Sequence, residues 1–311
     1  MKRFNKVILS VAGSLLAIGL VLALVGWAMG GQTSMEVDVG GYQATVGMTG
    51  FHAGINTSRK NATTVTDDEL AAFDKLDVDV SLGDVNIVSS DHFGIDMYYY
   101  GKNYELHYEN NGGTLKVWST SIPTIGINFG MNYDATVTVY LPEGTPLKDA
   151  TVKTAMGDID MQDFTADTLD VRANMGGVTV GNAHITDGTL KLDMGDLSIN
   201  GVTADKLDLT LSMGDLAAYG VTTEKELTVV NHMGKITVDG TLRGKTDVND
   251  SMGDISITTT MPESDYGYDL KTSMGSVEID GRDHDDKAKR SGGTHTIKAD
   301  NSMGDIEIYF G

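Results

Sequence analysis

The chain has 311 residues, including 38 Gly, 4 Pro and no Cys, and its 44 acidic and 23 basic residues give a net charge of −21. Without Cys there are no disulfides, thiolate metal sites or Cys nucleophiles. The acidic balance argues against nucleic acid as a partner, because binding phosphates requires a surplus of Lys and Arg. Abundant Gly and Asp predict many turns, and 40% hydrophobic residues suffice for a core.

The N-terminal segment predicts a membrane anchor. Lys2, Arg3 and Lys6 precede an uncharged, apolar stretch at 7–29, which as a helix would be about 35 Å long and could cross a bilayer. Basic residues on the short side predict that residues 1–6 are a cytoplasmic tail and that the rest of the chain is extracytoplasmic. The alternative is a cleaved signal peptide and a secreted protein. The segment 30–72, rich in Gly, Thr and Asn, is interpreted as a juxtamembrane linker with one short strand at 35–39.

A Met-Gly pair recurs through the second half of the chain. Its spacings are 19, 19, 19, 20, 19, 22 and 29 residues, and Leu82-Gly83-Asp84 resembles an earlier, degenerate copy. Regular recurrence at this period is typical of repeat architectures. The eight copies begin at Met156, Met175, Met194, Met213, Met233, Met252, Met274 and Met303.

Apolar and polar residues alternate on both sides of each pair, as in the pairs Ile159/Met161 and Leu197/Ile199 that follow it. Alternation with a Gly turn predicts two or three short strands per unit, and units of 19 or 20 residues must stack to bury a core. We therefore predict an all-β, single-domain parallel β-solenoid over 73–311, with the Met-Gly repeats in 150–311. Counting by parity, the repeated Met points inward, which favours core packing over a soft-metal site for copper.

Two segments interrupt the repeat. Residues 94–135 hold half of the 12 Tyr, and an aromatic recognition surface made by Tyr98, Tyr100, Tyr104 and Trp118 is one interpretation, with core packing as the alternative. Residues 281–295 form a charged excursion before the last unit. Because the strand at 306–310 would otherwise leave an open edge, we predict that this excursion covers the end of the rod.

Candidate chemistry is limited to a row of acidic residues two positions after each Met. Asp196, Asp215 and Asp254 belong to this row, and stacking would place Asp196 beside Asp215. Neighbouring carboxylates repel unless a cation screens them, so these three residues are candidates for Ca²⁺ binding. The alternative is that each Asp simply caps a tight turn. No other metal, cofactor or catalytic motif is found.

Several segments together resemble a known family. The sequences FDKLDVDVSLGDVNIV, VTVYLPEGTPLKDATVKTAMGDIDM and TSMGSVEIDG, followed by NSMGDIEIYFG, are similar to those of the bacterial putative-adhesin β-strand-repeat family, over about residues 73–311. The resemblance implies an envelope protein with a domain of unknown function, sometimes linked to envelope stress, and transfers no site residues. A right-handed solenoid is expected from the family and from the rule for parallel crossovers.

The sequence as a whole predicts an adhesin-like binding module or a structural module of the cell envelope, anchored in the membrane and without enzymatic activity. Its partners would be the membrane, through the N-terminal helix, and a wall glycan, a surface glycan or another envelope protein. Two alternatives stay open: an enzyme acting on polysaccharide from a β-helix scaffold, and an accessory sensor subunit of an envelope-stress system.

Overall fold

The computed structural model describes residues 34–39, 42–49, 52–59, 62–101, 104–120 and 134–311. The described residues belong to two compact units, one with residues 34–39, 42–49 and 52–59, the other with residues 62–101, 104–120 and 134–311. The predicted cytoplasmic tail at 1–6 and transmembrane helix at 7–29 lie outside the described residues. Among the described residues, no helix is long and apolar enough to cross a membrane.

The first unit contains a three-stranded antiparallel sheet. Its strands are β1 (Ser34–Val39), β2 (Tyr42–Thr49) and β3 (His52–Arg59), with β2 in the middle. The strand predicted at 35–39 is therefore present as β1. The rest of the segment is not the plain linker that its composition suggested, because Thr and Val suit a strand as well as a loop once a neighbouring strand pairs with them.

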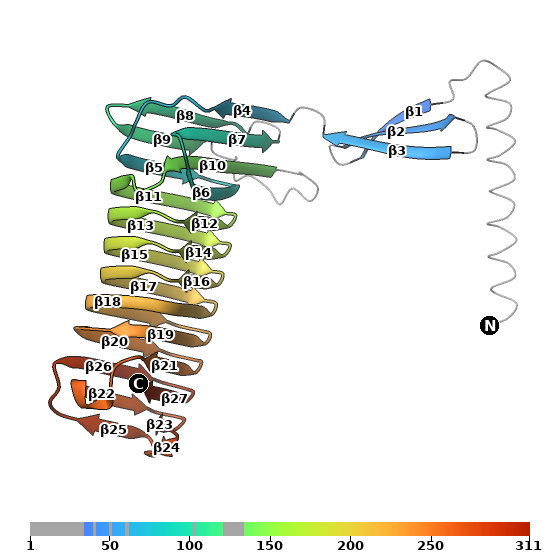
Figure 1. Cartoon of the computed structure of the whole chain (residues 1–311). Helices are drawn as coiled ribbons and strands as arrows, with labels where there is room; N and C mark the ends of the chain where they lie inside the picture. The colour runs from blue at the N-terminus through green and yellow to red at the C-terminus, as the bar shows by residue number, and fades with distance from the viewer. Residues whose placement is uncertain (1–33, 40–41, 50–51, 60–61, 102–103, 121–133) are drawn as a thin grey trace, which may run out of the picture. The chain divides into compact units, whose positions relative to one another are not determined.

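The second unit is a parallel β-solenoid, in which successive coils of chain stack on one another (Figure 1). The strands that lead into the Met-Gly turns pair with one another in one stack, and we call this stack, together with the strands that extend it at both ends, the pre-corner stack. In spatial order these are β8 (Leu106–Asn111), β9 (Thr114–Ser119), β5 (Lys75–Val80), β11 (Pro146–Met156), β13 (Thr165–Met175), β15 (His184–Met194), β17 (Thr203–Met213), β18 (Leu216–Asn231), β20 (Lys245–Asp250), β26 (His295–Asn301), β22 (Tyr266–Thr272) and β25 (Lys287–Arg290).

The strands that follow the turn make the post-corner stack. In spatial order these are β4 (Thr63–Asp67), β7 (Gly94–Tyr100), β10 (Asp134–Pro142), β6 (Asp84–Ser90), β12 (Ile159–Gln162), β14 (Val178–Gly181), β16 (Leu197–Asn200), β18, β19 (Ile236–Leu242), β21 (Ile255–Thr259), β27 (Ile306–Phe310), β23 (Val277–Ile279) and β24 (Arg282–Asp283). Strand β18 runs through one coil and belongs to both stacks. One 3-10 turn, η1 (Glu263–Asp265), precedes β22.

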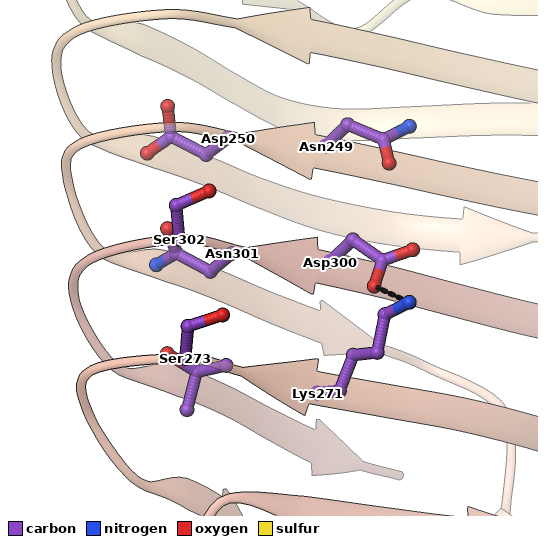
Figure 2. A pocket seen from close by; sticks show the side chains of 8 residues that line it. Asn249, Asp250, Lys271, Ser273, Asp300, Asn301 and Ser302 are labelled. Carbon is purple, nitrogen blue, oxygen red and sulfur yellow. Dashed lines mark ion pairs between the residues drawn. The ribbon is translucent and has the colours of Figure 1, made fainter.

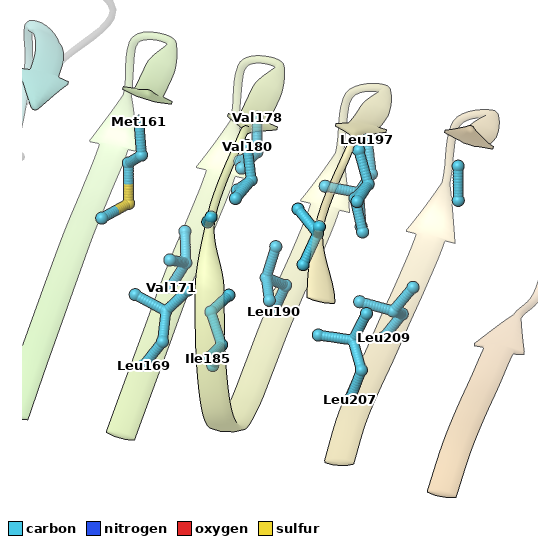
Figure 3. Packing of buried hydrophobic residues seen from close by; sticks show 14 of the residues in the cluster. Met161, Leu169, Val171, Val178, Val180, Ile185, Leu190, Leu197, Leu207 and Leu209 are labelled. Carbon is cyan, nitrogen blue, oxygen red and sulfur yellow. The ribbon is translucent and has the colours of Figure 1, made fainter. Parts of the chain in front are cut away.

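The core runs along the inside of the coils. Inward residues alternate with outward ones, as predicted, so that Leu190 and Leu209 lie at equivalent positions of paired strands and both are 1% exposed (Figure 3). Within β15 the alternation shifts at two consecutive exposed residues, Thr186 and Asp187, where the strand turns a further corner. Each coil buries a short apolar row that is completed only by its neighbours, which is why the units must stack to be stable.

The orientation predicted for the repeated Met is wrong. All eight are exposed, with exposed fractions from 39% for Met156 to 63% for Met274. The inward alternation ends two residues earlier, for example at Leu192, which is 1% exposed. The chain then leaves the strand at a Gly with positive φ, such as Gly195 at φ 142°. Parity fails because it assumes an extended chain up to Met, whereas the corner already begins there.

At both ends of the solenoid, the order of coils in space differs from their order in the chain. The last strands of the chain, β26 and β27, insert between the coil β20/β21 and the coil β22/β23. In Figure 1 the C terminus accordingly lies beside β27 and not at the tip of the stack. At the other end, β9 and β10 lie beyond the earlier coil β5/β6. The prediction that 306–310 forms the open edge is therefore wrong, because this strand is paired on both sides.

The predicted cap is confirmed, although on a different strand. The outermost coil is β22/β23, and the charged excursion returns along it as β25 and β24, both antiparallel. Ala288 of β25 lies opposite Leu270 and is 8% exposed, so the cap also covers the end of the core. At the opposite end β8 and β4 occupy the outermost positions and are also paired antiparallel. A paired or covered edge no longer templates the addition of another chain.

We expect an Ala288→Glu variant to form dimers or larger oligomers, because a carboxylate opposite Leu270 would detach β25 and expose the edge of β22. Size-exclusion chromatography with light scattering of the full chain in detergent measures this. Lys287→Glu, at an exposed position of the same strand, is the matched control and should leave the mass unchanged. An Ala288→Glu variant that remains a monomer with its fold intact would contradict the capping role.

Candidate functional site

The acidic row after the Met-Gly corner forms a ladder between coils. Asp196 Oδ1 accepts a hydrogen bond from the backbone N–H of Asp215 at 2.9 Å, and Asp215 Oδ1 accepts one from Lys235 N–H at 2.7 Å. Asp254 Oδ1 accepts from Asp305 N–H at 3.0 Å. Each carboxylate thus uses one oxygen to bind the corresponding position of the next coil, rather than its own turn as the capping alternative assumed.

The structure places the three Ca²⁺ candidates only partly together. Asp196 and Asp215 lie on adjacent coils, whereas the coil that carries Lys235 separates Asp215 from Asp254. The described residues contain no group of three or more His, Asp or Glu side chains arranged to hold a metal ion. Calcium binding by Asp196, Asp215 and Asp254 therefore stays a prediction. The hydrogen bonds that these carboxylates accept from the next coil are seen directly.

We expect Asp196→Ala to destabilise the solenoid by about 1 kcal/mol, because the N–H of Asp215 loses its acceptor at a solvent-accessible corner. Asp196→Asn keeps a carbonyl oxygen at the same place and should cost less. Thermal unfolding of both variants, with and without millimolar Ca²⁺, separates the two roles. If Ca²⁺ stabilises the wild type and both variants lose that stabilisation equally, Asp196 acts as a metal ligand.

A denser acidic cluster that the sequence analysis did not single out lies nearer the N-terminal end of the row. Asp84, Asp158 and Asp160 line a shallow pocket of about 340 Å³, together with polar residues of β6 and β14. Asp84 Oδ1 accepts from Asp158 N–H at 2.9 Å, and Asp158 Oδ1 accepts from Gly177 N–H at 2.8 Å. The signal was available in the sequence, since Leu82-Gly83-Asp84 does stack as the first copy of the corner: Gly83 N–H donates to the Met156 carbonyl at 2.8 Å.

The predicted aromatic surface is divided. Tyr104 is 1% exposed, its hydroxyl donates to the Leu82 carbonyl, and burial raises its pKa above the usual value, so it is a core residue and not part of a recognition surface. Tyr98 and Tyr100 are half-buried on β7 of the post-corner stack. Trp118 lies on β9 of the pre-corner stack. Four residues close in sequence are thus distributed over two stacks and the core.

Trp118 is the centre of a small aromatic and cationic patch. The His107 ring on β8 stacks on Trp118 with centroids 5.6 Å apart and an interplanar angle of 28°. Lys116 Nζ lies 5.9 Å from the centroid of the Trp118 ring, within the range of a cation–π interaction. All three are outward positions on paired antiparallel strands. We call Lys116, His107 and Trp118 the Trp118 patch.

A second pocket lies beside the corner of the C-terminal coils and has a volume of about 400 Å³ (Figure 2). An ion pair of 2.7 Å joins Lys271 to Asp300 on one side of it. On the other side lies Asp250, which is 5% exposed and whose Oδ2 has no hydrogen-bond partner among the described residues. Burial raises the pKa of Asp250 above its usual value, an effect ahead of the lowering by the backbone N–H groups of Ser251 and Met252.

The chain was compared with protein families, curated proteins and solved structures. A family model described as Toastrack DUF4097 matches residues 73–309. The crystal structure of a putative adhesin from Bacteroides fragilis NCTC 9343 is 13% identical, with 80% of this chain and 97% of that chain covered and a TM-score of 0.49. A putative adhesin from Parabacteroides distasonis ATCC 8503 is 12% identical, with 81% and 97% covered and a TM-score of 0.41. No curated protein matches the chain.

Proposed function

The chain belongs to the Toastrack DUF4097 family, and from this premise we propose that it is a membrane-anchored, extracytoplasmic binding rod of the cell envelope. The family resemblance inferred from the sequence is thereby confirmed. In the proposal, residues 7–29 hold the chain in the membrane and the solenoid presents its sides to a surface glycan or to another envelope protein. The acidic surface, with 20 basic against 44 acidic residues beyond the anchor, favours neutral or cationic ligands over polyanions.

The observation that carries this proposal is the capping of the solenoid. Antiparallel strands β25 and β24 cover one end, and β8 and β4 cover the other. A solenoid capped in this way does not grow by stacking further chains on its edges. Its long sides are then the surfaces that remain for a partner, and they carry the Trp118 patch.

The Trp118 patch fits a neutral sugar ring. Trp118 is half-buried, and the part of its indole that stays accessible can pack on the apolar face of a pyranose, while the neighbouring His107 and Lys116 supply hydrogen-bond donors at its rim. Asp79 lies opposite Trp118 on β5 and adds an acceptor. Large, rigid aromatic contact area combined with a few polar groups is typical of small-ligand recognition.

Binding is tested with the full chain in lipid nanodiscs against a panel of neutral polysaccharides, peptidoglycan and anionic wall polymers, with and without Ca²⁺. We expect a neutral glycan to bind and Trp118→Ala to weaken it at least tenfold. Tyr309→Ala removes an exposed aromatic residue of β27 and is the matched control. A panel without any binder contradicts the proposal. Release of new reducing ends during incubation would instead support the alternative of a polysaccharide-acting enzyme.

Membrane anchoring is tested separately. Cell fractionation should retain the full chain with the membranes, and protease added to intact cells should cleave the C-terminal domain. Deletion of residues 7–29 should leave the chain unexported. A chain found in the medium with a shortened N terminus would favour the cleaved signal peptide over the retained anchor.

A further inference from the structure

The exposed Met residues form one continuous column along the solenoid. Along the coils from Gly83 to Gly304, the N–H of the corner Gly donates to the carbonyl of the Met on the adjacent coil, at 3.0 Å for Gly157 to Met175 and 2.9 Å for Gly234 to Met252. These bonds fix the register of every corner. In spatial order the members, which we call the Met column, are Met156, Met175, Met194, Met213, Met233, Met252, Met303 and Met274.

Every member of the Met column is exposed, and core packing does not explain this. Exposed fractions run from 39% to 63%, whereas Met161 and Met97, which lie on inward positions of β12 and β7, are 0% and 2% exposed. The chain therefore uses Met in two distinct settings. The argument against a soft-metal site, that the sulfurs would be enclosed in the core, does not apply to sulfurs on the surface.

The spacing of the column suits a shared metal ion. Paired strands place equivalent residues about 4.8 Å apart, and two sulfurs bound to one ion at about 2.3 Å can lie up to about 4.6 Å apart. Met has three rotatable side-chain bonds, so neighbouring thioethers can converge by this small amount without moving the backbone. Because the register is repeated at every coil, any two or three adjacent members present the same arrangement.

The charge beside the column favours a cation. Two residues after Met stand Asp158, Asp196, Asp215, Asp254 and Asp305, and each uses its Oδ1 to accept a backbone N–H from the next coil. A row of acidic side chains two residues after the Met positions attracts cations to this edge of the solenoid. A hard ion such as Ca²⁺ prefers oxygen ligands, whereas thioethers select soft ions, above all Cu(I).

We propose that the Met column binds soft monovalent cations of the Cu(I) and Ag(I) class, each held by the thioethers of Met residues on adjacent coils. Binding requires no redox step, because the ion enters as Cu(I) or Ag(I) and keeps that oxidation state. Adjacent members such as Met194 and Met213 share one ion, and the neighbouring Asp row balances its charge. This binding site is independent of the Trp118 patch, which lies on β8 and β9.

The test uses the full chain in detergent, titrated with Ag(I) in chloride-free buffer and followed by calorimetry and native mass spectrometry. A quadruple variant, M175L/M194L/M213L/M233L, keeps the apolar surface but removes four thioethers. We expect the wild type to bind several Ag(I) ions, and the quadruple variant to bind fewer of them with at least tenfold lower average affinity. The double variant M97L/M161L removes the buried sulfurs instead and should bind Ag(I) like the wild type.

A second readout requires no variant. With Met methyl groups labelled with ¹³C, Ag(I) should shift the resonances of the Met column and leave those of Met97 and Met161 in place. Ca²⁺ at millimolar concentration should cause no such shifts. The proposal is overturned if the quadruple variant binds Ag(I) as the wild type does, if the wild type binds none at micromolar concentration, or if only resonances outside the column shift.

Discussion

A Gly195→Ala variant is expected to lose roughly 4 kcal/mol or more of folding free energy, although it adds a single methyl group. Gly195 has φ 142°, in a region that residues with a side chain rarely adopt. A Cβ at this position would lie 2.0 Å from the carbonyl oxygen of Gly176 on the adjacent coil. Both the strained backbone and the close approach of the neighbouring coil therefore oppose the substitution.

The measurement is thermal and urea unfolding followed by circular dichroism, with the full chain in the same detergent. Gly177→Ala is the matched control, because Gly177 has no such φ and its added Cβ would meet only Asp196 O at 3.6 Å and Asp158 Oδ1 at 3.8 Å. We expect the control to change stability by less than about 1 kcal/mol. Equal losses in the two variants would mean that the corner does not depend on the conformation of Gly195.

The corner also explains how much of the fold the sequence could predict. A period of 19 or 20 residues follows directly from the stacking register, since each corner Gly must lie above the next, and the inward rows of Leu and Val obey a two-residue alternation. The period therefore predicts the solenoid. It does not predict where the alternation stops, and for that reason the Met column was placed in the core, although it lies on the surface.

The ends of the solenoid were harder to predict than its middle. Strand β20 could in principle pair with β22, the next strand in the chain that belongs to the pre-corner stack, yet it pairs with β26, and β22 follows beyond it. Which strand pairs with β20 depends on long-range competition between similar coils, and the local pattern of apolar and polar residues carries no information on that pairing. The spacings of 22 and 29 residues before and after Met274 were the only sign in the sequence that the rhythm changes there.

The candidate site residues were likewise predicted in part. The acidic row was predicted because its residues share one position of the repeat, and the structure confirms that Asp196 and Asp215 are neighbours. The aromatic group had no such repeat to define its register. Tyr104 consequently proved to be buried, whereas Trp118 lies on the outside with His107 and Lys116 as its aromatic and cationic neighbours. Prediction from sequence succeeded for which repeated residues become neighbours, and failed for the direction of the repeated Met and for single residues outside the repeat.

The second large effect is expected at Asp250: Asp250→Asn should stabilise the folded chain by about 1–3 kcal/mol at neutral pH. Asp250 stands two residues before Met252, at the last inward position of its coil. Asn301, at the equivalent position, donates from Nδ2 to the Gly253 carbonyl at 2.7 Å, and Asn231 donates to the carbonyls of Gly214 and Gly234 at 3.2 and 3.1 Å. The two Asn side chains at this position therefore donate to the Gly carbonyls, whereas Leu192 fills the same position with an apolar group.

An ionised carboxylate cannot supply that donor. Asp250 Oδ1 accepts from Ser251 N–H at 2.8 Å, much as the Asn301 Oδ1 accepts from Met303 N–H at 3.2 Å. Its Oδ2, which corresponds to the donating nitrogen of Asn301, has no partner among the described residues. Burial raises the pKa of Asp250, Asp254 adds to the increase, and His232 opposes it. Protonation of Oδ2 would turn the unpartnered acceptor into a donor, as the Nδ2 of Asn301 is at the equivalent position.

The sign of the pH dependence follows from this raised pKa. Because the folded state holds the Asp250 proton more tightly than the unfolded chain, whose value is near the ordinary 3.8, Asp250 does not destabilise the fold below that pH. Stability is lost as the pH rises from there through the folded pKa, and the loss is complete above it. The advantage of Asp250→Asn should therefore be absent in acid and largest at neutral pH.

Urea unfolding of wild type and variant across this pH range measures the difference directly. Asp215→Asn is the matched control, because Asp215 lies on the exposed side of an equivalent corner, accepts its hydrogen bond through an oxygen that Asn retains, and is not one of the charges that shift the pKa of Asp250. The control should not show a stabilisation that grows from acid to neutral pH. A gain from Asp250→Asn that is the same at every pH would mean that packing, and not ionisation, sets the cost. A loss at neutral pH would mean that the carboxylate is bound to a cation through Oδ2, since replacing a ligand oxygen would then remove a favourable contact.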